Sequence, residues 1–126
     1  MVGRGKVVMC IDDSEVILSV VEGALMAEGY QVLCAQSGPA GLCLLGQMTI
    51  DAIVVDLQMP GMNGIVVAQC AKKQLPKLPV IMFSGDSDHI EEYLPSEIDC
   101  FVHKPNLGEL ISAVRRYTWE PREGGS

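Results

Sequence analysis

Short runs of branched apolar residues alternate with longer segments of helical period along this chain. That alternation is typical of β-α units around a parallel sheet whose strands are buried on both faces. It predicts an α/β fold with a doubly wound sheet of five strands. The expected strands span residues 6–11, 31–35, 50–55, 79–83 and 100–102.

Helical segments and their ends are also marked in the sequence. Ser37 is expected to open the second helix and Asn63 to cap the third, whereas Gly29 should stop the first. Apolar stripes of helical spacing are formed by Ile17, Val20, Val21, Ala24 and Leu25, and near the C-terminus by Leu107, Leu110, Ile111, Val114 and Thr118.

Composition excludes several classes of protein. At 126 residues the chain has the length of one domain, and its short apolar runs cannot span a membrane. No secretory signal is present at the N-terminus, so we expect a cytoplasmic location. The five cysteines have no metal-finger spacing and are expected to be reduced and mostly buried. A net charge of −7 argues against direct nucleic-acid binding and favours a protein or a small ion as the partner.

Polar side chains stand where the predicted strands end. They are Asp12 and Asp13 after the first strand, Asp56 after the third, Ser84 after the fourth and Lys104 after the fifth. The carboxyl ends of parallel strands share one edge of an open α/β sheet, which is where ligands bind. We therefore expect three carboxylates, a hydroxyl and an ammonium group to meet at that edge.

The charge at this edge indicates what it could hold. Three ionised carboxylates and one lysine leave a local charge of −2, and crowded carboxylates repel one another unless a cation joins them. Mg²⁺ prefers oxygen ligands and would neutralise the edge, so that an anionic phosphoryl group could approach. Asp56, at the centre, is then the candidate nucleophile, because carboxylates can form aspartyl-phosphates.

The chain resembles the receiver domains of two-component response regulators over nearly all of its length. The matching segments are IDD at 11–13, VVDLQMPGMNG at 54–64, FSG at 83–85 and FVHKP at 101–105. The resemblance implies a flavodoxin-like sheet of order 2-1-3-4-5 with five surrounding helices. Residues 1–120 would form the receiver domain, with a flexible tail or linker remnant at 121–126.

The resemblance also implies site residues and partners. The phosphodonor would be a sensor histidine kinase or a histidine phosphotransfer protein, and the output a downstream effector protein or domain. It implies no turnover of an external substrate, and it leaves open a phosphorylation-dependent dimer. The implied roles are phosphoryl acceptance by Asp56, Mg²⁺ ligation by Asp13, Asp56 and the backbone carbonyl of Gln58, a water-mediated role for Asp12, phosphoryl contact by Lys104, a switching hydroxyl at Ser84, a rotamer-changing aromatic at Phe101 and a cis peptide bond before Pro105.

Each site residue also has a purely structural interpretation. Asp12 with Glu15 fits a capping box for the first helix, and Asp56 before a Pro-Gly turn fits an Asx-turn. Ser84 could cap its loop, Lys104 could be a solvated lysine, and Phe101 could belong to the core. Taken together, these interpretations require five coincidences at one edge of one sheet.

The sequence disfavours three alternative functions. A haloacid-dehalogenase-like phosphatase also uses an aspartate nucleophile after a buried strand, but it needs a second acid where this chain has Gln58. A degenerate receiver that binds partners without phosphorylation is disfavoured by the intact Asp56, Lys104 and acid pair. A nucleotide-binding α/β domain is disfavoured because no G-x-G-x-x-G motif or P-loop follows the first strand.

The segment between Ser84 and Lys104 departs from the family pattern. It is shorter than usual and carries Pro95, so the helix expected there should be short or irregular. This segment belongs to the face through which many receivers dock their partners. The two histidines, His89 and His103, are interpreted as ordinary surface residues, although His103 adjoins the site.

Overall fold

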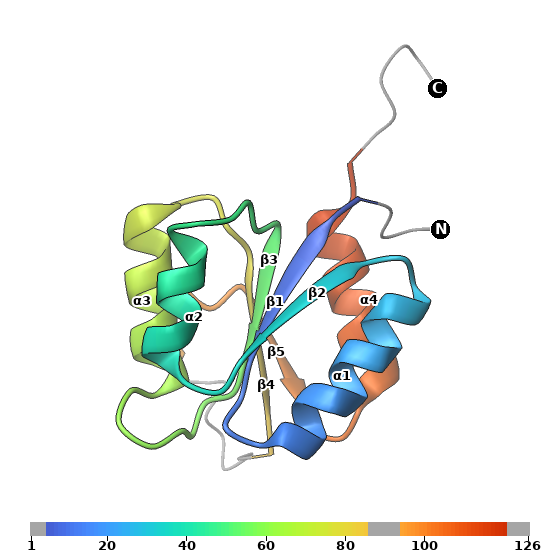
Figure 1. Ribbon diagram of the computed structural model, residues 1–126, viewed down its shortest axis with the longest axis horizontal. Helices are drawn as coiled ribbons and strands as arrows, with labels where there is room; N and C mark the ends of the chain where they lie inside the picture. The colour runs from blue at the N-terminus through green and yellow to red at the C-terminus, as the bar shows by residue number, and fades with distance from the viewer. Residues whose placement is uncertain (1–4, 86–93, 121–126) are drawn as a thin grey trace.

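The computed structural model describes residues 5–85 and 94–120. Its centre is one parallel sheet with the strand order β2-β1-β3-β4-β5, which confirms the predicted fold class (Figure 1). The strands are short and agree with the expected positions to within two residues at each end. They are β1 (Val7–Ile11), β2 (Gln31–Ala35), β3 (Ala52–Val55), β4 (Val80–Ser84) and β5 (Cys100–His103).

Helices cover both faces of this sheet. In the described part of the chain there are four, with α1 and α4 on one face and α2 and α3 on the other (Figure 1). The fifth expected helix would fall largely in residues 86–93, outside the described residues, and so does His89. The helices are α1 (Glu15–Ala27), α2 (Gly38–Leu45), α3 (Gly64–Gln74) and α4 (Leu107–Thr118).

The strand residues alternate between two apolar layers, as a sheet buried on both faces requires. Val8 and Cys10 pack toward α1 and α4, whereas Met9 and Ile11 pack toward α2 and α3. All four residues of β3 are buried, because this strand lies in the middle of the sheet. The polar residue that follows β3 therefore emerges from the centre of the sheet.

Of the four helix ends interpreted from the sequence, three are confirmed and one is wrong. Ser37 and Asn63 cap α2 and α3 by accepting hydrogen bonds from backbone N–H groups, and Gly29, with φ +96°, follows the end of α1. The capping box of Asp12 with Glu15 is wrong, because Ser14 is the N-cap of α1 and its hydroxyl accepts from the N–H of Ile17.

Two expectations about burial are also wrong. Val20 is 46% exposed, because α1 packs through Leu18, Val21 and Leu25, a stripe turned away from Val20. All five cysteines are free, but only Cys10 is buried. Cys34 is exposed because β2 is an edge strand. Among the described residues, no helix is both long and apolar enough to cross a membrane.

Candidate functional site

Four strand ends bring the predicted polar residues to one edge of the sheet. Asp12 and Asp13 follow β1, Asp56 follows β3, and Lys104 follows β5, while Ser84 is the last residue of β4. One carboxylate oxygen from each of the three aspartates lies within 4.8 Å of the others. In the acidic cluster of Asp12, Asp13 and Asp56, the third aspartate is more than 40 positions from the other two in the chain, and they meet because β1 and β3 pair directly.

The connection from β3 to α3 fixes the position of Asp56. Its N–H donates to the carbonyl oxygen of Ile11 at 3.0 Å, which continues the β1–β3 pairing into the site. Gly61 takes a positive φ of +80° in the turn. The first residue of α3, Gly64, approaches the backbone of Asp56 so closely that an added Cβ would lie 2.3 Å from its carbonyl oxygen. Glycine is required here because helix α3 starts directly against the site.

Lys104 joins two members of the acidic cluster. Its ammonium nitrogen lies 2.7 Å from Oδ2 of Asp12 and 3.4 Å from Oδ1 of Asp56. Its backbone N–H donates to the carbonyl oxygen of Ser84 at 3.0 Å, so β4 holds it in place. The peptide bond between Lys104 and Pro105 is cis, in agreement with the expectation.

The carboxyl group of Asp56 is in an environment that disfavours its charge. Burial raises the pKa of Asp56 above its ordinary value; the Lys104 ammonium opposes this, and the negative charge of Asp12 adds to it. Hydrogen bonds from Ser84 and Lys104 also lower the pKa, but they do not cancel the effect of burial. A second cation beside this carboxylate would favour its ionised form.

Asp12 and Asp13 differ although they are adjacent. Asp12 is buried, and its two oxygens accept from the Lys104 ammonium and from the backbone N–H of Ser14 at 2.9 Å. Asp13 is exposed at the rim of the site, as is Gln58. Three carboxylates facing one point supply the hard oxygen ligands that Mg²⁺ takes in proteins, so the residues present fit this ion.

Residues 8–115 match the model of the response regulator receiver domain. The chain belongs to this family. It is therefore a receiver domain of two-component signalling, and the three aspartates, Ser84 and Lys104 lie within the matched residues.

Solved structures agree with this assignment. The receiver domain of the Francisella response regulator 1452 is 28% identical, with a TM-score of 0.81, and the match covers 90% of this chain and 97% of that one. Response regulator TrrA from Thermotoga maritima, in complex with Mg²⁺ and BeF, is 26% identical, with a TM-score of 0.83 and coverage of 89% and 98%. Chemotaxis protein CheY4 from Vibrio cholerae shares the fold at 24% identity, with a TM-score of 0.83 and the same coverage.

The expected switch aromatic of this receiver domain has a partner that sequence reasoning missed. Phe101 is half-buried in β5, and its ring meets that of His103 edge to face, with centroids 4.8 Å apart and an interplanar angle of 68°. The interpretation of His103 as an ordinary surface residue is wrong, because it is a half-buried strand residue. The signal that could have found it is the spacing of two residues, which puts both side chains on one face of a strand.

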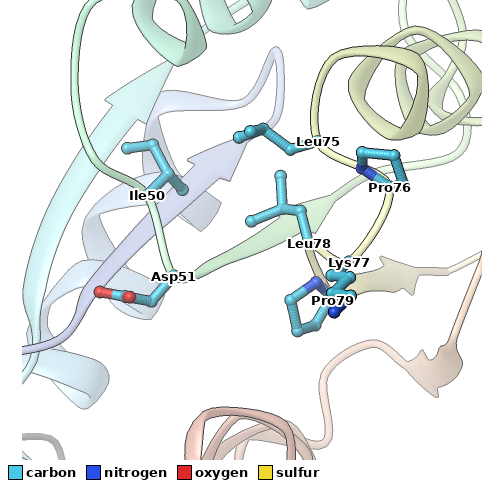
Figure 2. A pocket seen from close by; sticks show the side chains of 7 residues that line it. All are labelled: Ile50, Asp51, Leu75, Pro76, Lys77, Leu78 and Pro79. Atoms are coloured by element: carbon cyan, nitrogen blue, oxygen red, sulfur yellow. The ribbon is translucent and has the colours of Figure 1, made fainter.

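A hollow of about 480 Å³ lies at the opposite end of the receiver domain's sheet (Figure 2). It is formed where the residues before β3 meet the loop between α3 and β4. Its walls are mostly apolar and include no member of the acidic cluster. The lining residues are Ile50, Asp51, Leu75, Pro76, Lys77, Leu78 and Pro79.

Proposed function

We propose that Asp56 accepts a phosphoryl group from a phosphohistidine on a sensor histidine kinase or a histidine phosphotransfer protein, in a reaction that requires Mg²⁺. The observation that carries this proposal is the acidic cluster, whose three carboxylates converge within 4.8 Å beside the Lys104 ammonium. The chain belongs to the receiver family, and its acidic cluster lies at the edge of the sheet where α/β proteins bind ligands. We assign residues 1–120 to this domain.

Asp13, Asp56 and the backbone carbonyl of Gln58 are the proposed ligands of Mg²⁺. Asp12 would act through a bound water, because its oxygens already accept from Lys104 and Ser14. When bound, the ion supplies positive charge that offsets the repulsion between the carboxylates and the incoming phosphoryl oxygens. The complex of the Thermotoga relative with Mg²⁺ and BeF supports this choice of ion.

In the transfer step, a carboxylate oxygen of Asp56 attacks the phosphorus atom. The new P–O bond forms as the P–N bond to the donor imidazole breaks, and the imidazole leaves with the bonding pair and takes up a proton. Lys104, 3.4 Å from Asp56, is close enough to contact a phosphoryl oxygen there. Ionised Asp56 is the nucleophile, so the positive charge of Lys104 also keeps it in its reactive form.

The phosphorylated domain would then change a surface that a downstream effector protein or domain recognises. The Ser84 hydroxyl, which bonds to Asp56 in the present state, would donate to a phosphoryl oxygen instead. Phe101 would follow by changing rotamer. In this proposal the domain modifies only its own Asp56 and is a switch, not an enzyme that turns over an external substrate. A cytoplasmic location remains a prediction of the sequence.

The experiment is intact-mass spectrometry after incubation with acetyl phosphate. With Mg²⁺, wild-type protein should gain the mass of one phosphoryl group, and chelation by EDTA should prevent the gain. Asp56→Asn should gain none, and Asp51→Asn, which changes an aspartate at the opposite end of β3, should be labelled like wild type. Labelling of Asp56→Asn at the wild-type level would refute the proposal.

The labelling experiment and a phosphate-release assay separate the alternatives. A degenerate receiver would keep its fold and remain unlabelled at every Mg²⁺ concentration. A phosphatase would release inorganic phosphate continuously from a phosphomonoester, whereas the proposed domain should release only the phosphate that it first accepts.

A further inference from the structure

His103 lies between the two residues of the proposed switch. Because β4 and β5 are parallel, register partners present their side chains on the same face, about 4.8 Å apart. Ser84 pairs with His103, and Met82 pairs with Phe101. The opposite face of β5 holds Cys100 and Val102, which pack toward α1 and α4. The Ser84, His103 and Phe101 side chains therefore form a continuous row on the other face.

Contacts are observed at both ends of this row, one at the site and one at the edge of the sheet. Ser84 bonds to Asp56 at one end, and the Phe101 ring meets His103 edge to face at the other. An edge-to-face contact holds two rings in a defined orientation, since the positive ring edge faces the negative ring surface. A displacement of His103 removes this contact, so the rotamer preference of Phe101 depends on where His103 lies.

We propose that His103 is the positioning residue that couples Ser84 to Phe101. This proposal rests on the proposed function in one respect, namely that phosphorylation moves the Ser84 hydroxyl. In the resting state, His103 holds Phe101 in its present half-exposed orientation. When Ser84 moves toward a phosphoryl oxygen, the packing beside His103 changes, the edge-to-face contact is lost, and Phe101 takes its other rotamer.

The resting protein tests the first half of this proposal without any ligand. The chain has only two phenylalanines, so selective ¹³C labelling gives one signal set for Phe101 and one for Phe83, which is 3% exposed and reports an intact core. His103→Ala should raise the ratio of the other Phe101 rotamer to the present one by roughly 2- to 12-fold, the factor that corresponds to one aromatic pair. His103→Tyr, which retains an aromatic edge, should restore the wild-type ratio.

Cys100→Ala is the matched control, because Cys100 is a half-buried β5 residue on the opposite face. It should leave the Phe101 ratio unchanged. An unchanged ratio in His103→Ala with native Phe83 signals, or an equal change in Cys100→Ala, would overturn the proposal. If Phe83 signals show that His103→Ala is unfolded, His103→Tyr and His103→Leu, which keep the bulk, decide the same comparison.

The second half uses Mg²⁺ with beryllofluoride, whose binding is followed separately by ¹⁹F NMR. In wild type, the bound ion should shift the Phe101 ratio, and Ser84→Ala should reduce that shift. In a His103→Ala background, Ser84→Ala should have no further effect, because the link is already absent. If Ser84→Ala reduced the shift of the Phe101 ratio as much in the His103→Ala background as in wild type, the proposed coupling through His103 would be overturned. Failure of beryllofluoride to bind wild type would count against the proposed function, while the ligand-free comparison would still decide the role of His103.

Discussion

At the scale of single residues, Asp56 is an acid whose surroundings in the protein disfavour its ionised form. Asp56 as a whole residue is 8% exposed and lies close to the buried Asp12, and its pKa is raised mainly by burial. Perturbed titration of this kind clusters at functional sites, because folding alone would favour a neutral group there. The same environment that costs stability in the resting protein favours the arrival of a cation.

The first residue-scale prediction concerns stability and pH. In metal-free buffer near neutral pH, Asp56→Asn should raise the melting temperature by roughly 2–5 °C, since the neutral amide avoids burying a charge. A folded-state pKa above the unfolded one means that the unfolded state loses its proton first as the pH rises. Ionisation therefore lowers stability at neutral pH, and this loss fades as the pH falls toward the unfolded value of about 3.9.

Thermal unfolding with EDTA across this pH range measures the difference. The gain in melting temperature of Asp56→Asn should shrink steadily on acidification. Asp13→Asn, at an exposed position, should show a smaller gain than Asp56→Asn at neutral pH. A gain that stays constant with pH, or a less stable Asp56→Asn protein at neutral pH, would contradict the account of Asp56.

The second residue-scale prediction ranks the two neighbouring acids. Asp13→Ala should weaken Mg²⁺ binding by roughly tenfold or more, because it removes a proposed direct ligand. Asp12→Ala should weaken it less, since the oxygens of Asp12 already accept from Lys104 and Ser14. Isothermal titration calorimetry gives both affinities, with Glu15→Ala as the control for an exposed acid nearby. The reverse order would show that Asp12 is the direct ligand.

At the scale of secondary-structure elements, the close approach of α3 to the end of β3 sets the site. Gly64→Ala should lower the free energy of unfolding by about 1–3 kcal/mol, the usual cost of forcing an extra carbon into packed structure. Its Cβ would meet the Asp56 backbone, so the rate of labelling by acetyl phosphate should fall as well. Chemical denaturation and intact-mass spectrometry measure the two effects.

Gly108→Ala provides the control, because Gly108 is also in the first turn of a helix, but an added Cβ there would lie 3.9 Å from the side-chain oxygen of Asn106, an ordinary contact distance. That change should leave labelling intact and leave stability equal or slightly higher, as alanine favours helices over glycine. If Gly64→Ala and Gly108→Ala changed stability and labelling equally, the close approach of α3 to β3 would have no role in forming the site.

Helix boundaries show where local sequence is sufficient and where it is not. Ser37 and Asn63 were predicted as caps because no neighbouring residue competes for that position. Before α1, three successive polar residues could each cap the helix. Ser14 is the N-cap, and Asp12 instead accepts a hydrogen bond from Lys104, which follows β5 and is 92 residues away. No local pattern contains that information.

At the scale of the whole molecule, the periodic apolar runs were enough to place all five strands, and the motif residues were enough to predict the acidic cluster. The interactions that were missed depend on position within the sheet or on distant partners. Cys34 is exposed because β2 lies at an edge, and His103 meets Phe101 on the other edge strand. Tyr30 and Thr118 share a buried hydrogen bond of 2.8 Å across 88 residues, which links the start of β2 to α4.

The arrangement of the whole fold makes Asp56 the convergence point. It follows the central strand, with both apolar layers behind it and residues from β1, β4 and β5 around it. The most direct test of phosphoryl acceptance is therefore chemical identification of the modified residue. Borohydride reduces an acyl phosphate to a primary alcohol and leaves free carboxylates unchanged, so it marks the acceptor permanently.

Wild-type protein would be incubated with Mg²⁺ and phosphoramidate, a small donor with the same P–N bond as phosphohistidine, then reduced and sequenced by tandem mass spectrometry. The alcohol should appear at position 56 and should be absent when Mg²⁺ is omitted. Modification at Asp12 or Asp13 in place of Asp56, or at no residue in a folded and Mg²⁺-saturated protein, would contradict phosphoryl acceptance by Asp56.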